Sequence, residues 1–310
     1  MRKQPIARTE IGKNLFVVHN SGNVMTLYVD NVYSGQEIHF LLTSDRHHDS
    51  VNCDRELELK HLEQAKKKGA LIIDVGDFFD VMQGKFDPRR TYSDLRPEYK
   101  ADAYLDEIVK EAADFYGPYA ANILMLGRGN HDSQVLKNCG TDIIGNLVHR
   151  LNSDHGGHIQ AGGYGGWVRI CFSMGGTQHE SVLIKYFHGA GGGGPVTRGV
   201  IQSNRQAVYL PDADIVLNGH THDGWMLPIE RERLSLQGEV INDIQYHIRI
   251  PTYNNDYGDG SGGWFVETWK APRPRGAVWL KMTCDQGVKR NAAGKRVRKH
   301  IKIEPVLDVE

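Results

Sequence analysis

Five apolar runs of this sequence each end in a segment that carries histidine, aspartate or asparagine. The runs are Ile38 to Thr43, Ala70 to Val75, Asn122 to Leu126, Val182 to Phe187 and Ile215 to Leu217. The segments that follow are Asp45-Arg46-His47, Gly76-Asp77, Gly129-Asn130-His131-Asp132, His188-Gly189 and Gly219-His220-Thr221-His222. Apolar runs bounded by glycine are typical of buried strands, and ligands bind at the carboxyl ends of strands in open α/β sheets. We therefore expect these segments to meet at one site.

The side chains at these strand ends offer imidazole nitrogens and carboxylate or amide oxygens, with no thiolate among them. The candidate metal ligands are Asp45, His47, Asp77, Asn130, His188, His220 and His222. Mixed nitrogen and oxygen ligands suit manganese, iron, zinc or nickel, and they argue against a structural zinc built on cysteine. This set is too large for one tetrahedral ion. It suits two ions roughly 3.5–4 Å apart, bridged by a carboxylate and a hydroxide.

The order of these segments resembles a known family. From Asp45 to His222 the chain carries D-x-H, G-D-x-x-D, G-N-H-D, a later histidine and G-H-x-H, which is the ordered signature of the calcineurin-like metallophosphoesterases. It is similar in part to nuclease subunits of double-strand-break repair complexes and to stand-alone phosphoesterases of phages and prophages. The resemblance implies an α/β fold, a four-layer α/β/β/α sandwich with two mixed sheets, and a metal site at the strand carboxyl ends.

The resemblance also implies a role for each residue of the signature. Two divalent ions would share Asp77, and the remaining ligands would divide into Asp45, His47 and His222 for one ion and Asn130, His188 and His220 for the other. Manganese is the favoured metal, with iron, zinc, nickel or magnesium as alternatives. The resemblance assigns His131 to protonation of the leaving group, as general acid, and Asp80 to orienting that histidine.

Three further residues are candidates for substrate binding. Arg128 directly precedes Gly129-Asn130-His131, and an arginine at that position binds phosphate in related phosphatases. His48 extends the first segment and is expected to contact substrate or to support a ligand from behind. Arg46 stands between Asp45 and His47 and is able to face either way. Successive residues of an extended segment point in opposite directions, so His47 and His48 are not expected to bind the same ion.

The function that these features predict is metal-dependent hydrolysis of phosphate esters by in-line attack of a metal-bridging hydroxide. The favoured substrate is a phosphodiester of DNA or RNA. A small-molecule nucleotide or cyclic nucleotide is the first alternative, and a non-enzymatic binding module on the same fold is the second. Protein phosphatases carry Arg-Gly after G-D-x-x-D, where this chain has Val81-Met82, which argues against that class.

Three segments have open roles. The glycine-rich stretch 189–194 lacks the ending of a phosphate-binding P-loop, so it either approaches the substrate closely or serves as a linker. The basic residues between Lys85 and Arg96 either grip phosphate or belong to a solvated loop. The basic run Lys289 to Lys302 either contacts nucleic-acid backbone or forms a solvated hairpin.

Composition sets the remaining expectations. The chain has 310 residues, a formal net charge of -1 and four cysteines without a C-x-x-C pair. We expect one domain over residues 1–310, with a motif core at 37–226 and a β-rich part at 227–310. No apolar leader and no membrane-length apolar window occur, and the cysteines are typical of reduced thiols, so a soluble cytoplasmic protein is predicted. A homodimer remains open.

Overall fold

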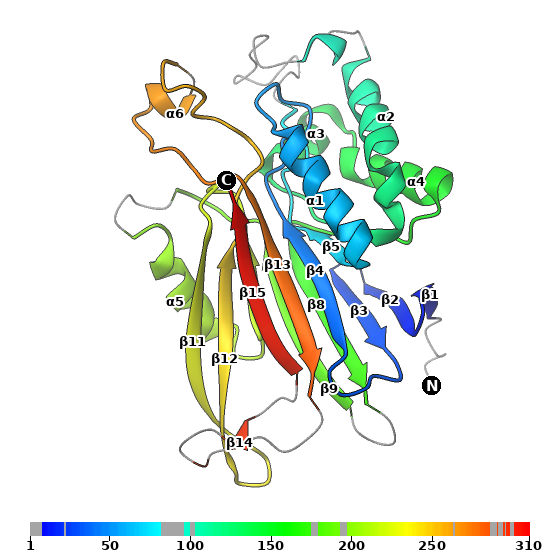
Figure 1. Ribbon diagram of the computed structural model, residues 1–310. Coiled ribbons are helices and arrows are strands. Elements are labelled where there is room, and N and C mark those ends of the chain that lie inside the picture. Colours follow the sequence, from blue (N-terminus) through cyan, green and yellow to red (C-terminus); the bar gives the residue numbers. More distant parts are fainter. Residues whose placement is uncertain are drawn as a thin grey trace.

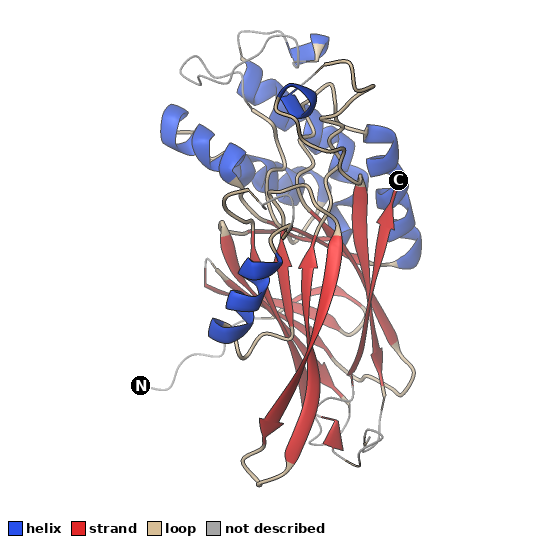
Figure 2. Cartoon of the chain, turned by 90° about the vertical axis from the view of Figure 1, so that its left-hand side faces the viewer, coloured by secondary structure: helices blue, strands red, loops and turns tan. Residues whose placement is uncertain are grey.

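The computed structural model contains two mixed β-sheets flanked by helices (Figures 1 and 2). It describes residues 8–21, 23–81, 96–99, 103–174, 179–192, 197–262, 264–285, 290, 294, 296–297 and 301–310. The basic residues 85–92, glycines 193–194 and most of the basic run 289–302 therefore lie outside the described residues. Within the part described, no helix is long and apolar enough to cross a membrane.

The larger sheet has nine strands. Their order is β1 (Thr9–Gly12), β2 (Leu15–Ser21), β3 (Val24–Val29), β8 (Gly165–Ser173), β9 (His179–Phe187), β10 (Ile215–Asn218), β12 (Val240–Arg249) and β11 (Trp225–Leu234), with β14 (Arg296–Val297) paired to β12. The pairs β3–β8, β9–β10, β10–β12 and β12–β14 are parallel and the others are antiparallel. The parallel pair β9–β10 brings two of the polar segments to the same edge of this sheet.

The smaller sheet has six strands. Their order is β15 (Ile301–Val309), β13 (Gly276–Cys284), β4 (Glu37–Thr43), β5 (Leu71–Asp74), β6 (Ile123–Leu126) and β7 (Gln160–Ala161). The strands from β4 to β7 run parallel, whereas β13 is antiparallel to both of its neighbours. The three parallel strands β4, β5 and β6 therefore deliver the other three polar segments to one edge. All five strands expected before these segments are present.

Helices cover the outer faces of both sheets. They are α1 (Arg55–Lys68), α2 (Tyr104–Tyr116), α3 (Asn130–Cys139), α4 (Ile143–His155), α5 (Val200–Tyr209) and α6 (Trp264–Glu267), with short 3-10 turns at Pro97–Tyr99 and Gly117–Asn122. Figure 1 shows α1 to α4 together beside the six-stranded sheet and α5 beside β11 and β12. The expected four-layer α/β/β/α arrangement with two mixed sheets is confirmed.

Alternation along the strands explains why their sequences are apolar without interruption. Phe40 and Leu42 of β4 pack between the two sheets, whereas Leu41 packs under the helices. Ile73 and Ile72 of β5 divide in the same way. Because successive side chains of a strand point to opposite faces, a strand buried on both faces needs apolar residues at every position.

A buried arginine ties the first polar segment to the interior. Arg46 is 1% exposed, and its Nε donates to the Asp74 carboxylate at 2.7 Å. One terminal nitrogen donates to Glu58 of α1 at 2.8 Å and the other to the Thr43 hydroxyl at 2.9 Å. The interior is a poor solvent for charge, so such an arginine must stay with its carboxylates. The expectation that Arg46 contacts substrate is wrong.

His48 turns the same way. Its ring is fully buried, with Nδ1 2.8 Å from Glu58 and Nε2 3.2 Å from Glu111. Burial lowers the pKa of His48, but the charge of Glu58 and the hydrogen bonds to both glutamates raise it above its usual value. A protonated His48 is thus a partner of two carboxylates inside the molecule. The expectation that it contacts substrate is wrong for the same reason.

We expect Arg46→Met to destabilise the fold by about 3–5 kcal/mol, because the substitution leaves Asp74 and Glu58 buried without their counter-charge. The measurement is urea unfolding of metal-free protein. Arg169→Met, at an exposed position of β8, is the matched control and should change the free energy of unfolding by less than about 0.5 kcal/mol. Equal stability of the two variants would contradict this account.

Candidate metal centre

The backbone at the candidate site is unusual. Among the described residues, positive φ at a non-glycine position occurs at five of the candidate ligands, namely Asp45 (50°), His47 (47°), Asp77 (52°), His220 (71°) and His222 (58°). Such conformations cost on the order of 1–3 kcal/mol each and persist only where the surrounding structure imposes them. The ends of β4, β5 and β10 therefore turn sharply as they enter the site, and each turn re-aims a ligand side chain.

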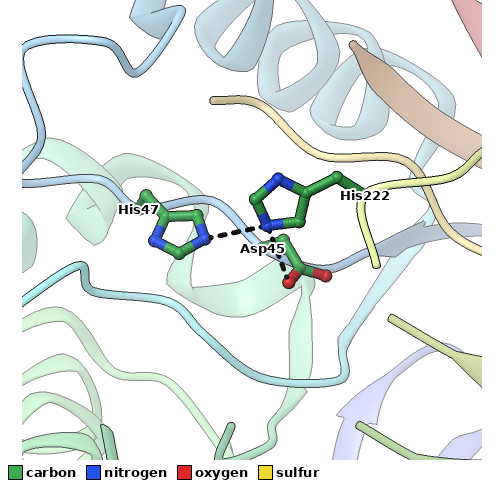
Figure 3. Close-up of side chains that lie close together, drawn as sticks. All are labelled: Asp45, His47 and His222. Carbon is green, nitrogen blue, oxygen red and sulfur yellow. Dashed lines mark hydrogen bonds and ion pairs between the residues drawn. The ribbon is translucent and has the colours of Figure 1, made fainter. Parts of the chain in front are cut away.

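The first group of ligands consists of Asp45, His47 and His222 (Figure 3). The Nε2 atoms of His47 and His222 lie 3.3 Å apart, and His222 Nε2 lies 3.4 Å from Asp45 Oδ1. On the far side of each ring, His47 Nδ1 lies 3.1 Å from Asp80 Oδ1 and His222 Nδ1 lies 2.8 Å from Asp256 Oδ2. A ring that donates its Nδ1 proton to a carboxylate presents the Nε2 lone pair on the opposite side.

The second group consists of Asp77, Asn130, His188 and His220. His188 Nε2 lies 3.1 Å from Asp77 Oδ2 and 3.2 Å from Asn130 Oδ1. His220 Nδ1 lies 2.7 Å from the same Asn130 oxygen. His188 Nδ1 is 3.2 Å from the Val75 carbonyl, so the Nε2 of this ring also faces inward. Oxygen and nitrogen lone pairs again converge on one small volume.

Both groups fit divalent metal ions. Lone pairs that converge from imidazole and carboxylate repel one another unless a proton or a cation lies between them, and histidines held through their far nitrogen are the usual metal-binding form. Asp77 contacts His188 of the second group and forms a further cluster with His47 of the first. The structure therefore brings together the residues expected from the sequence to bind metal, with Asp77 between the two groups.

The charges of three histidines in the site follow from the carboxylates beside them. Burial lowers the pKa of His47, but the hydrogen bond and charge of Asp80 raise it to about 9. Burial likewise lowers the pKa of His188 and His222, whereas Asp77 raises the former to about 9 and Asp256 with Asp45 raises the latter to about 10. At neutral pH the imidazoles of His47, His188 and His222 thus hold protons that a metal ion must displace.

His131 stands at the edge of both groups. Its Nδ1 lies 2.7 Å from the backbone carbonyl of Asp80 and 3.6 Å from the Asp80 carboxylate, while its Nε2 lies 3.9 Å from Asp77 Oδ2. The carboxylate of Asp80 is closer to His47, at 3.1 Å. The expected orientation of His131 by Asp80 therefore operates chiefly through the backbone carbonyl, and the carboxylate serves His47.

Two carboxylates that support the site, Asp132 and Asp256, are not among the residues predicted from the sequence. Asp132 accepts hydrogen bonds from the backbone of Asp77 at 3.0 Å and of Gly129 at 2.9 Å, so it fixes two of the strand ends against each other. The position of Asp132 in the motif G-N-H-D could have indicated that it belongs to the site. Asp256, the partner of His222, comes from a glycine- and asparagine-rich loop that carries no motif. Only the fold brings it to the site.

Arg128 is held away from the ligand groups. Its Nη2 lies 2.6 Å from Asp142 Oδ2, and its Nη1 donates to the Gly162 carbonyl. Arg128 does not line the cavity above the metal groups. Its expected role in phosphate binding stays a prediction.

A cavity of about 700 Å³ opens above the two groups. Ligands such as Asp77 and His222 form its floor. Its walls come from parts of the chain without a motif, and they include Gly191, Gly192, Arg198, Phe265, Trp269, Lys270 and Arg273. The site thus combines a metal-binding floor with walls that carry aromatic rings and cationic groups.

Comparison with known proteins gives distant structural likenesses. No family model matches the chain, and no curated protein sequence matches it. A predicted phosphoesterase from Streptococcus pneumoniae is 12% identical over 87% of this chain and 99% of its own, with a TM-score of 0.31. Vacuolar Protein Sorting 29 from Cryptosporidium parvum is 13% identical over 88% and 99%, with a TM-score of 0.34. A putative 5′-nucleotidase from Staphylococcus aureus is 12% identical over 88% and 55%, with a TM-score of 0.37. Likenesses this distant carry no information on chemistry.

We expect Mn²⁺ affinity to rise between pH 6.5 and pH 8.5, measured by isothermal titration calorimetry. The sign follows from the raised pKa values of about 9 to 10, because fewer protons compete with the metal as pH increases. Each displaced proton contributes about tenfold in affinity per pH unit.

The same titration tests the ligand assignment. His222→Ala should lose one of the two binding events, whereas His158→Ala, at an exposed histidine outside the site, should titrate like the unmodified chain. Unchanged stoichiometry in His222→Ala would remove His222 from the set.

Proposed function

We propose that this protein is a calcineurin-like metallophosphoesterase that hydrolyses phosphodiesters, with nucleic acid as the substrate class. One observation carries the proposal: two ligand groups meet around Asp77, and His131 lies beside them at the floor of an open cavity. Two-metal sites of this composition serve in-line displacement at phosphorus. A scaffold that only binds a partner has no need for both groups together with His131.

The side chains of the floor have separable tasks. When bound, two divalent ions would lower the pKa of a water and offset the charge of the phosphoryl oxygens. We assign to His131 the proton for the leaving oxygen, because the Asp80 carbonyl engages its Nδ1 and its ring lines the cavity. Proton donation of this kind typically contributes 10²–10⁴-fold.

The cavity walls support a nucleotide substrate over a simple phosphate ester. Trp269 is 96% exposed, has a φ of 58° and lines the cavity. An exposed tryptophan at the wall of a cavity offers a face on which a base stacks. Such stacking contributes on the order of 1–3 kcal/mol per base. Arg198 and Lys270 line the same cavity and supply positive charge for flanking phosphates. A small nucleotide would use the same features, which keeps it as the second candidate.

The first test is a Mn²⁺-dependent activity panel on purified protein. We expect cleavage of bis-p-nitrophenyl phosphate and of a single-stranded oligonucleotide, with weaker cleavage of p-nitrophenyl phosphate and of a cyclic dinucleotide. Asp77→Asn should lose both metal and turnover, since Asp77 lies between the two groups. Preference for the monoester would replace the phosphodiesterase proposal with a phosphatase. No turnover with any metal would favour the binding module.

The panel also separates the roles of the two catalytic candidates. His131→Asn should keep metal yet lose about 10²–10⁴-fold in turnover of the oligonucleotide. Its turnover of bis-p-nitrophenyl phosphate should fall less, because the p-nitrophenolate leaving group departs without a proton. Asp80→Asn should weaken metal binding, because the Asp80 carboxylate contacts the ligand His47. The dependence of turnover on the leaving group should remain, because the backbone carbonyl of residue 80 still contacts His131. Full oligonucleotide turnover in His131→Asn would reject the acid role.

We expect Trp269→Ala to raise KM roughly 5- to 100-fold for the p-nitrophenyl ester of thymidine 5′-phosphate. KM for bis-p-nitrophenyl phosphate, which has no base, should change less than about twofold. Trp269→Phe is the matched control and should retain most of the affinity, since it keeps an aromatic face. Equal effects of Trp269→Ala on the two substrates would exclude stacking as its role.

A further inference from the structure

A second, smaller cavity lies on the other side of the segments that carry His188 and His220. Its volume is about 180 Å³, and its lining includes Phe187, Gly189, Gln202, Arg205, Gln206 and Arg249. The glycine-rich stretch separates the two cavities, because Gly189 and Ala190 line the smaller one and Gly191 and Gly192 line the larger one. None of the candidate metal ligands lines the smaller cavity.

Arg249 gives this cavity its chemistry. Its side chain is 1% exposed and donates from Nη1 to the Gly219 carbonyl at 3.0 Å. Its Nε is buried without a hydrogen-bond partner, and no carboxylate of the described residues forms an ion pair with it. Burial lowers the pKa of Arg249 below its usual value. Arg46, which is equally buried, forms ion pairs with two carboxylates, whereas Arg249 forms none among the described residues and has the charges of Asp223 and Asp45 only at longer range.

The backbone around Arg249 leaves space for its guanidinium. A Cβ at Gly199 would lie 2.7 Å from Arg249 Nη2, so any other residue at position 199 would push the guanidinium aside. The φ of Gly199 is +84°, which also disfavours a side chain. The start of α5 thus accommodates the arginine without neutralising it.

Helix α5 adds polar groups to the same cavity. Gln202, Arg205 and Gln206 are three and four residues apart on the helix, and all three line the cavity. Gln206 is 7% exposed, and its Oε1 is buried without a hydrogen-bond partner. The cavity is therefore lined by two arginine and two glutamine side chains.

We propose that this cavity is a binding site for a phosphate group. Its oxygens would accept hydrogen bonds from the guanidinium groups of Arg249 and Arg205. A cavity of about 180 Å³ is smaller than the 300–1,000 Å³ of typical organic ligand pockets and suits a compact ion. The site is distinct from the metal groups and does not depend on phosphodiesterase activity.

The position of the site links it to the metal centre. Gly219, whose carbonyl accepts from Arg249, directly precedes His220, and Gly189 directly follows His188. A Cβ at Gly189 would lie 2.7 Å from the Cβ of His220, which shows how closely the two segments pack. An anion bound to Arg249 therefore acts on the backbone that places two of the candidate ligands. The phosphate group could be free phosphate or a terminal phosphate of a nucleotide.

The test is thermal unfolding of the full chain after chelation of metal, so that phosphate has no metal to bind. Inorganic phosphate is titrated at constant ionic strength with chloride as the balancing anion. At a tenfold excess over its dissociation constant it should raise the Tm of the unmodified chain by about 2–4 °C. Arg205→Gln and Arg249→Met should each lose most of this shift. Arg150→Gln, which removes an exposed arginine from α4, is the matched control and should retain it.

The stability of the two arginine variants decides how their phosphate shifts are compared. Arg249→Met also loses the hydrogen bond to the Gly219 carbonyl, so its shift with phosphate is measured against its own Tm without phosphate. If that variant does not fold, Arg205→Gln decides alone, since Arg205 is exposed and its loss leaves the interior intact. A phosphate shift that is equal in Arg205→Gln, Arg249→Met and Arg150→Gln would overturn the site.

Thymidine 5′-monophosphate, with thymidine as its control, identifies the source of the phosphate group. A larger Arg205-dependent shift with the nucleotide than with inorganic phosphate would assign the site to a phosphate carried by a nucleotide. A shift with inorganic phosphate alone would assign it to the free ion. Both results support the site, and neither requires turnover at the metal centre.

Discussion

The ion pairs of Arg46 with Asp74 and Glu58 are the constraint on which the metal centre depends. They connect the end of β5, the start of α1 and the segment after β4 in a region closed to water. Because Arg46 must remain with these carboxylates, its neighbours Asp45 and His47 are turned the opposite way, toward His222. The positive φ values of Asp45 and His47 are the backbone conformation that produces this turn. The charge that stabilises the interior thus also aims the first two ligands.

The contacts of Asp77 are a second constraint on the metal centre. Its backbone amide donates a hydrogen bond to the Asp132 carboxylate, its own carboxylate contacts His188, and the amide of His131 donates to that carboxylate at 2.8 Å. Burial raises the pKa of Asp77, but the neighbouring histidines hold it well below its usual value. A carboxylate that stays ionised among imidazoles attracts cations. One residue therefore connects both ligand groups with the histidine proposed as acid.

The part of the chain after the last motif completes the site in two ways. Asp256 fixes the ring of His222 from the loop after β12, and Trp269 with Lys270 forms a cavity wall after α6. Arg249, at the end of β12, supports the carbonyl of Gly219 from the other side. The strands β11, β12, β13 and β15 are integrated into the two sheets. The residues that position the candidate ligands and those that line the cavity therefore come from segments far apart in the sequence.

The sequence by itself determined which side chains could bind metal and on which strands they stand. Apolar runs that end in aspartate, asparagine or histidine are local patterns, and parallel pairing brings such ends to one edge. Only the tertiary structure decided that Arg46 and His48 face inward, that the Asp80 carboxylate serves His47, and that Asp256 supports His222. These outcomes depend on which distant carboxylate shares a buried space with which cation, and no spacing along the chain encodes that pairing.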